Sequence, residues 1–409
     1  MPRQNKIVIR NGTTTPNAVD FDTAEPAWDK TAGKLYIKDG AGSMVEVGAG
    51  GGGGLTHFVE SEETASPNAT VPVDALTATD ASYTDIDVAL VAKGTGATLA
   101  QVPDGTAAGG SKRGTYATDL QKVRASSGRV ASGNYSVIAG GYGNGTSGGY
   151  ASTVGGFSNQ ASSNYSFVGG GQSNEAKTNT HATCVGGSSN DATGQYSFVG
   201  GGQSNAASST RAVVAGGVSN IASGLASTVC GGAENLANAS YSFVSGGYRG
   251  TARSIQGYHV FPAIYNAISG GTLYGKTQSA LLLLARQTTD ATATVLTSNS
   301  SAAATTNQVI LPNNSAYHFK GSVIATVTGG GDTASWEFKG AIKRGANAAS
   351  TAIVGTVIKD VVAYDAGASA WDVTFTADTT NGGLKVEVTG AAATTIRWVA
   401  KLETTEVTY

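Results

Sequence analysis

Cysteine, charged residues and long apolar runs are all scarce in this chain of 409 residues. Two cysteines are too few for a fold framed by disulfides. Only 13% of the residues are charged and the net charge is −2, which leaves no basic surface for nucleic acid. The longest apolar run, residues 280–285, is too short to cross a bilayer. We therefore expect neither a nucleic-acid partner nor membrane insertion.

Residues that commonly carry catalysis are few and scattered. No Gly-x-Ser-x-Gly motif and no Cys/His pair is present. Two glycine-rich segments, 93–96 and 109–114, lack the fixed spacing of a phosphate-binding loop. The carboxylates of a predicted strand at 84–91 have no companion histidine, which favours a solvated strand face. The four histidines also lack the spacing of metal ligands: His57, His181, His259 and His318. We therefore expect no metal and no cofactor.

Glycine, in contrast, is abundant, and much of it recurs with a fixed period. A Gly-Gly pair returns at intervals of 15 residues, with a single interval of 16. The pairs begin at Gly140, Gly155, Gly170, Gly186, Gly201, Gly216, Gly231 and Gly246. An asparagine follows four residues after the start of the first seven pairs, at Asn144, Asn159, Asn174, Asn190, Asn205, Asn220 and Asn235. Such a short, regular period indicates one coil per repeat and predicts a β-solenoid.

Each repeat also contains a short apolar run before its glycines. β-branched and aromatic residues bounded by glycine and asparagine predict short strands with turns between them. The residue two positions before each pair is small and mostly apolar, so this column is predicted to face a narrow interior: Ile138, Thr153, Val168, Cys184, Val199, Val214, Val229 and Val244. The glycines and asparagines are interpreted as turn residues, because both tolerate a left-handed backbone.

The energetics of such a coil suggest self-association. Coils spaced about 4.8 Å apart give a shaft on the order of 40 Å long for eight repeats. Two or three apolar side chains per coil are few against about 1–2 kcal/mol of backbone entropy per ordered residue. We therefore expect a lone chain to leave a seam exposed, which self-association would cover. Cys184 and Cys230, three coils apart, are interpreted as buried free thiols that act as small hydrophobes.

The N-terminal third divides into three predicted segments. Residues 1–48 alternate like a small β module, with a hairpin expected at Asp39-Gly40. Residues 49–54 form a glycine-rich hinge. Residues 55–132 are predicted to be a small β domain and connector, with a short helical turn within 116–132.

The solenoid is predicted to span residues 133–256, and residues 257–409 have a different character. Glycine thins out there and longer alternating strands appear, which predicts a β-sandwich of jelly-roll type. Trp336, Trp371 and Trp398 align with apolar strand faces, so we expect them in its core. The fold class is thus all-β throughout.

Recognition in this last domain is expected to fall to its loops. The candidate receptor-binding residues are Asp332, Asn347, Tyr364, Asp365 and Asn381. A glycan-cleaving enzyme needs two carboxylates held about 5–10 Å apart in a groove. Acidic residues exist for this role, but any β domain of this size has as many: Asp332, Glu337, Asp360, Asp365 and Asp372. We therefore expect binding without catalysis, and we assign no catalytic residue.

Several segments resemble tail fibres of tailed bacteriophages. Residues 7–13 and 34–40 are similar to the N-terminal attachment module of such fibres, and residues 93–97 and 102–106, followed by the repeats, are similar to their middle part. The repeats also resemble the trimeric head repeats of bacterial adhesins. This resemblance implies an elongated homotrimer that holds a phage baseplate or tail protein at its N-terminus and faces a bacterial surface glycan or protein with its C-terminal head.

The sequence therefore predicts a structural tail fibre of a virion, made in the host cytoplasm, that adheres to the host surface. Two alternatives stay open: a polysaccharide-degrading tailspike, and a fibre attached to the capsid. A bacterial trimeric adhesin is disfavoured, since the first residues show no hydrophobic stretch of the kind that signals secretion.

Overall fold

The computed structural model describes residues 92–263 and 274–409, together with six strands nearer the N-terminus. Its regular elements in these residues are β-strands and two 3-10 turns, η2 (Ala348–Ser350) and η3 (Ala366–Ala368). The all-β fold class is thus confirmed. No helix among the described residues is long and apolar enough to span a membrane. The chain divides into two compact units, residues 1–90 and 91–409, each of which is described by itself.

The first unit contains two small sheets. Four strands pair in the order β1-β2-β3-β4: β1 (Arg10–Gly12), β2 (Pro26–Asp29), β3 (Lys34–Lys38) and β4 (Met44–Glu46). β3 and β4 are antiparallel and flank Asp39-Gly40, as the hairpin prediction requires. β5 (Phe58–Glu63) and β6 (Val73–Ala78) form an antiparallel pair. The turn itself, the 49–54 hinge, the 84–91 strand and His57 lie outside the described residues.

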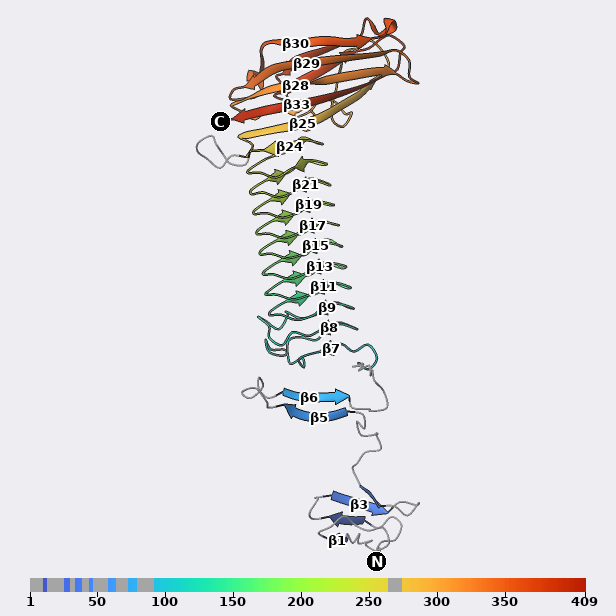
Figure 1. Cartoon of the computed structure of the whole chain (residues 1–409), viewed down its shortest axis with the longest axis vertical. Helices are drawn as coiled ribbons and strands as arrows, with labels where there is room; N and C mark the ends of the chain where they lie inside the picture. Colours follow the sequence, from blue (N-terminus) through green and yellow to red (C-terminus); the bar gives the residue numbers. More distant parts are fainter. Residues whose placement is uncertain are drawn as a thin grey trace, which may run out of the picture. The chain divides into compact units, whose positions relative to one another are not determined.

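The second unit begins with the solenoid that the repeats predict (Figure 1). One face is a ladder of parallel strands: β7 (Thr98–Leu99), β8 (Thr118–Asp119), β9 (Val137–Ile138), β11 (Ser152–Thr153), β13 (Phe167–Val168), β15 (Thr183–Cys184), β17 (Phe198–Val199), β19 (Val213–Val214), β21 (Thr228–Val229), β23 (Phe243–Val244) and β24 (His259–Pro262). A second face is a seven-stranded parallel sheet: β10 (Gly145–Thr146), β12 (Gln160–Ala161), β14 (Glu175–Ala176), β16 (Asp191–Ala192), β18 (Ala206–Ala207), β20 (Ile221–Ala222) and β22 (Leu236–Ala237). Single-residue bridges make a third ladder, from Val123 to Tyr248.

The interior of the solenoid is built from two columns of small side chains. The column that includes Val168 and Cys184 is fully buried, which confirms the prediction of an inward-facing column. Alanines of the second sheet, such as Ala176 and Ala192, oppose it and are equally buried. A single chain therefore closes this core, while large apolar side chains such as Phe157 and Val185 stay exposed on the outside of the coils.

In every Gly-Gly turn the second glycine has a left-handed φ, and in four turns the first glycine also has a positive φ, at Gly170, Gly201, Gly231 and Gly246. Gly187 has φ +84°, and a Cβ there would lie 2.1 Å from the Gly202 carbonyl oxygen of the next coil. Gly186 is not in the left-handed region, and a Cβ there would meet nothing within 4 Å. Glycine thus allows neighbouring coils to approach at the second position.

The asparagines have a different role from the one the sequence suggested, because none of the seven in the repeat column has a positive φ. The left-handed residue is the one before, for example Ser189 with φ +57° before Asn190. The Asn190 amide donates to the Gly186 and Gly202 carbonyls at 2.8 and 2.9 Å, and its Oδ1 accepts the Asn205 N–H at 2.9 Å. The column is a buried hydrogen-bond ladder that links successive coils.

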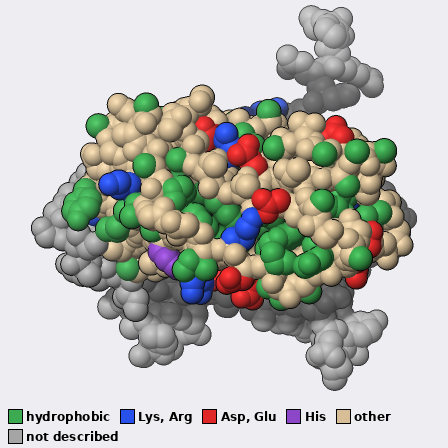
Figure 2. Space-filling model, turned by 90° about the horizontal axis from the view of Figure 1, so that it is seen from above, with side chains coloured by type: hydrophobic (Ala, Val, Ile, Leu, Met, Phe, Trp, Pro, Cys, Tyr) green, Lys and Arg blue, Asp and Glu red, His purple; other side chains and the backbone are tan. Residues whose placement is uncertain are grey.

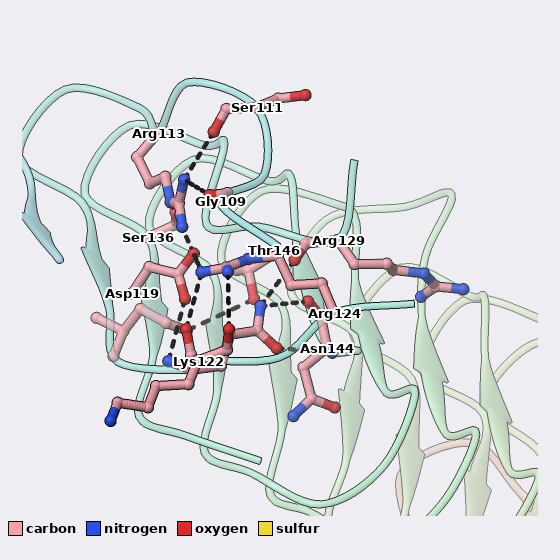
Figure 3. A network of polar contacts seen from close by, with 12 residues as sticks. Gly109, Ser111, Arg113, Asp119, Lys122, Arg124, Arg129, Ser136, Asn144 and Thr146 are labelled. Carbon is pink, nitrogen blue, oxygen red and sulfur yellow. Dashed lines mark hydrogen bonds and ion pairs between the residues drawn. The ribbon is translucent and has the colours of Figure 1, made fainter. Parts of the chain in front are cut away.

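The solenoid starts before residue 133. β7 pairs in parallel with β8, and β8 pairs in parallel with β9. Residues 116–132 contain no helix, so the predicted helical turn is wrong. Gln121 continues the asparagine ladder, since its Oε1 accepts the Asn144 N–H at 3.0 Å. Figure 3 shows the polar network at this end of the solenoid, in which buried Asp119 accepts hydrogen bonds from Arg113 at 2.8 Å and Arg124 at 3.2 Å.

At the other end, the solenoid sheet continues directly into the C-terminal domain. β24 pairs with β25, and the order runs on through β33, β28 and β29 to β30, giving a sixteen-stranded sheet. These long antiparallel strands are β25 (Thr277–Thr288), β28 (Ser315–Val327), β29 (Thr333–Arg344), β30 (Ala352–Tyr364) and β33 (Ile396–Thr408). Buried Glu406 of β33 accepts hydrogen bonds from Arg253, at 3.0 Å, and Gln278, at 2.9 Å. This buried cluster ties the last coil to the C-terminal sheet.

A smaller sheet covers one face of these long strands and makes a β-sandwich. It contains β26 (Thr294–Val295), β27 (Val309–Ile310), β31 (Asp372–Asp378) and β32 (Gly383–Thr389). Trp336, Trp371 and Trp398 are at most 5% exposed between the sheets, which confirms their predicted core role. The order β33-β28-β29-β30 is one Greek key, so the described strands do not show the two Greek keys of a jelly roll.

Candidate functional site

The five predicted receptor-binding residues lie at two opposite ends of the long sheet. Asp332, Tyr364 and Asp365 are at the start of β29 and the end of β30. The Asp365 carboxylate accepts the Thr333 N–H at 2.9 Å, so it links the end of β30 to the start of β29. Tyr364 is 58% exposed. The Tyr364 ring is thus open to a ligand.

Asn347 follows the other end of β29, and Asn381 lies in the turn between β31 and β32, which Arg344 of β29 contacts. Asn347 caps η2, where its side chain accepts the Ser350 N–H at 3.1 Å. Asn381 donates from its side-chain amide to Asp378 at 2.8 Å. Burial alone would raise the pKa of Asp378, but hydrogen bonds from Asn381, Gln308 and Thr380 outweigh it and lower this pKa from 3.8. Both asparagines therefore hold turns together, and the five residues do not form one site.

A hollow of about 340 Å³ lies instead on the outer face of the long sheet. Four strands, β28, β29, β30 and β33, line it, and we call it the charged hollow. Three lysines and three acids project from these strands into it: Lys320, Lys339, Lys401, Glu337, Asp360 and Glu403. Figure 2 looks onto the molecule from the β30 end and shows acidic and basic side chains together between hydrophobic patches.

The charges of the hollow fall into a paired half and an unpaired half. Glu403 lies 2.6 Å from Lys401 and 3.4 Å from Lys320, and the hydrogen bond from Lys401 lowers the pKa of Glu403. In the described part of the chain, Glu337, Asp360 and Lys339 make no ion pair or side-chain hydrogen bond. These three side chains are available to a polar ligand.

Glu337 and Asp360 are directly opposed on neighbouring antiparallel strands. Such a pair places its Cβ atoms about 4.5–5.5 Å apart. Enzymes that hydrolyse glycosides hold their two carboxyl groups about 5–10 Å apart. The sequence contained both acids, but their pairing depends on the register of β29 and β30, which the residues alone do not reveal.

Other chemistry-bearing residues are not brought together. Among residues with described placement, no group of three or more His, Cys, Asp or Glu could hold a metal ion. Burial raises the pKa of the Cys184 thiol to about 12, whereas Cys230 is exposed, so the prediction of two buried thiols is wrong for Cys230. His181 stands in a stack of exposed aromatic rings on the solenoid.

Comparisons with known proteins give weak structural matches only. No protein-family model and no curated protein matches the sequence. Three solved tailspike proteins of Acinetobacter phages are weakly similar to this chain, those of phages AM24, Fri1 and vB_ApiP_P1, at 9%, 10% and 11% identity and TM-scores of 0.18, 0.20 and 0.20. The matches cover 66%, 76% and 72% of this chain, but only 53%, 56% and 59% of those proteins.

One of these comparisons corrects the expectation about catalysis. The Fri1 tailspike is described as a capsular polysaccharide depolymerase, so the expectation that this chain is not an enzyme is contradicted.

Proposed function

We propose that the protein is a virion component of a tailed bacteriophage that binds polysaccharide on the bacterial surface. The observation that carries this proposal is the charged hollow, in which Glu337, Asp360 and Lys339 have no partner within the described residues. Carboxylates accept hydrogen bonds from sugar hydroxyls, and a lysine ammonium group donates hydrogen bonds to sugar oxygens. The hollow lies on strands that continue the solenoid sheet, and this rigid support suits a binding site.

Cleavage of the bound polysaccharide is a second candidate function. It is favoured by the opposed Glu337 and Asp360, because their register puts two carboxylates on one face of the sheet, and such a pair serves as general acid and as nucleophile or base. In that reaction one carboxyl group gives its proton to the leaving oxygen while the glycosidic bond breaks. Water then supplies the hydroxyl group at the anomeric carbon and restores the proton.

The assembly that the resemblance implies also belongs to this proposal. We propose a homotrimer whose residues 1–48 attach to a baseplate or tail protein and whose residues 257–409 face the host, with Tyr364 as a further receptor contact. The edge strand β30 supports self-association, because outside the hollow it exposes large apolar side chains that a neighbouring subunit would cover: Val354, Val361 and Val362. Light scattering of the full chain is expected to give a mass near three chains, and a monomer would contradict the trimer.

Binding is tested with the full chain and a panel of purified capsular polysaccharides and lipopolysaccharides, by biolayer interferometry. The double variant Glu337→Gln/Asp360→Asn keeps the side-chain volumes but removes both charges. Since a hydrogen bond to a charged group contributes about 1.5–3 kcal/mol, we expect affinity to fall more than about tenfold. The matched control is Glu387→Gln, an acid of β32 on the other sheet. Equal affinity of the double variant and the wild type would contradict the site.

Cleavage is tested on the same polysaccharides by counting new reducing ends. If the wild type produces new reducing ends and the double variant does not, cleavage of the polysaccharide is established. Binding without release would leave adhesion as the function.

A further inference from the structure

A row of aromatic rings runs along the solenoid on one of its turns. We call it the tyrosine ladder: Tyr116, Tyr135, Tyr150, Tyr165, His181 and Tyr196. Successive ring centroids lie 4.9–5.2 Å apart, which is one ring per coil, and the planes are within 26° of parallel. The ladder covers six consecutive coils and is separate from the charged hollow.

The backbone of the ladder is unfavourable for its own residues. All six have φ between +55° and +63°, a region that costs bulky side chains about 1–2 kcal/mol each. The fold does not require an aromatic residue there, because Arg211 and Ala226 take the same conformation in the next two coils, with φ +58° and +52°. Ring stacking offsets part of this cost but leaves open why six coils keep rings at this position.

The hydroxyl groups of the ladder are free. The five tyrosines are 46–56% exposed, and none of their hydroxyls forms a hydrogen bond within the described residues. Because ring faces cover one another, the parts that meet solvent are the ring edges and the hydroxyls. The chain thus offers a straight row of polar groups with the period of the coils.

We propose that the tyrosine ladder binds an extended polysaccharide chain that lies along the solenoid. Its period is close to the length of one pyranose unit, so successive phenol hydroxyls can bond to successive sugars. Each bond is weak, and affinity accumulates along the chain because binding of one sugar holds the next in place. This inference rests on the proposed function of glycan binding and adds a second site to it.

The test uses the full chain and the polysaccharide of the panel that the wild type binds, together with size-fractionated oligosaccharides prepared from it. The triple variant Tyr135→Phe/Tyr150→Phe/Tyr165→Phe keeps the rings and removes three hydroxyls. We expect its affinity to fall at least about tenfold. The control is Tyr241→Phe, which has the same backbone conformation but lies outside the ladder, and its affinity is expected to be unchanged. Affinity of the wild type is expected to rise with oligosaccharide length up to about six sugars, one per ring.

The possible failures are distinguishable. If the triple variant binds as the wild type does while Glu337→Gln/Asp360→Asn does not, the ladder inference is overturned and the proposed function stands. If the wild type binds no polysaccharide of the panel, both are overturned. If the triple variant changes the mass in light scattering, the ladder is a contact between copies of this chain and the inference is wrong.

Discussion

Gly187→Ala is expected to destabilise the solenoid far more than Gly186→Ala, although the two glycines are neighbours in one turn. At Gly187 the added methyl group carries two costs. The left-handed φ of +84° contributes about 1–2 kcal/mol. The methyl carbon would also lie 2.1 Å from the Gly202 carbonyl oxygen, so the two coils must move apart.

That movement weakens the hydrogen bonds which the Gly202 oxygen accepts. The donors are the Ser188 N–H and the Asn190 amide, both at 2.9 Å. At about 0.5–1.5 kcal/mol each, their loss brings the total to about 2–5 kcal/mol of unfolding free energy. Gly186 has room for a methyl group and no left-handed φ, so its substitution is expected to change stability by no more than about 0.5 kcal/mol.

The assay is urea unfolding followed by far-ultraviolet circular dichroism, with both variants and the wild type at one protein concentration. Amide hydrogen exchange in the coils around residue 187 adds a local reading, because coil stabilities depend on nearest neighbours. Equal losses of stability in the two variants would refute the assignment of close coil contact to the second glycine.

Three further predictions follow from buried groups. Asn190→Ala removes a buried amide that bonds to both neighbouring coils, so we expect the free energy of unfolding to fall by about 2–4 kcal/mol in the same assay. An effect below about 0.5 kcal/mol would contradict the asparagine ladder. Glu406→Ala leaves the Arg253 guanidinium buried without its carboxylate, so we expect the free energy of unfolding to fall by about 3–5 kcal/mol. An unchanged urea midpoint would be inconsistent with the buried cluster that ties the last coil to the C-terminal sheet. A maleimide reagent should label native protein once, at Cys230, while buried Cys184 reacts only after unfolding; peptide mass mapping that finds Cys184 labelled in native protein would show that the core column is open.

The repeat period was enough to predict the solenoid and its core. A column of small apolar residues at a 15-residue interval can face only one direction, so Val168 and its equivalents were placed correctly from the residues. The role of Asn190 could not be read in the same way. Asparagine is compatible with a left-handed turn and with a buried ladder, and only the distance between coils decides between them.

The early coils were missed because their spacing is irregular. Tyr116 and Tyr135 are 19 residues apart (135 − 116), whereas later equivalents are 15 or 16 apart. A loop that contains Arg124 takes up the extra length, and its buried bonds to Asp119 replace the regular turn. Irregular length hides a repeat from a periodic search even where the pairing of strands persists.

The charged hollow was missed for a topological reason. Glu337 and Asp360 were recognised as acids, but Lys401 comes from β33, which returns across the molecule to lie beside β28. Conversely, Asn347 and Asp365 are candidate receptor-binding residues of the loops, and both side chains bond to the backbone instead: Asn347 caps η2, and Asp365 accepts the Thr333 N–H. Loop composition therefore identified turns better than it identified a site.

The central claim, that glycan binds in the charged hollow, is tested most directly by carboxyl footprinting. The full chain is labelled with carbodiimide and glycine ethyl ester, with and without the polysaccharide it binds, and the modified peptides are quantified by mass spectrometry. Glycan binding in the hollow predicts that the polysaccharide protects Glu337 and Asp360 while labelling of Glu387, on the other sheet, is unchanged. Unchanged labelling of Glu337 and Asp360 at saturating polysaccharide would contradict it.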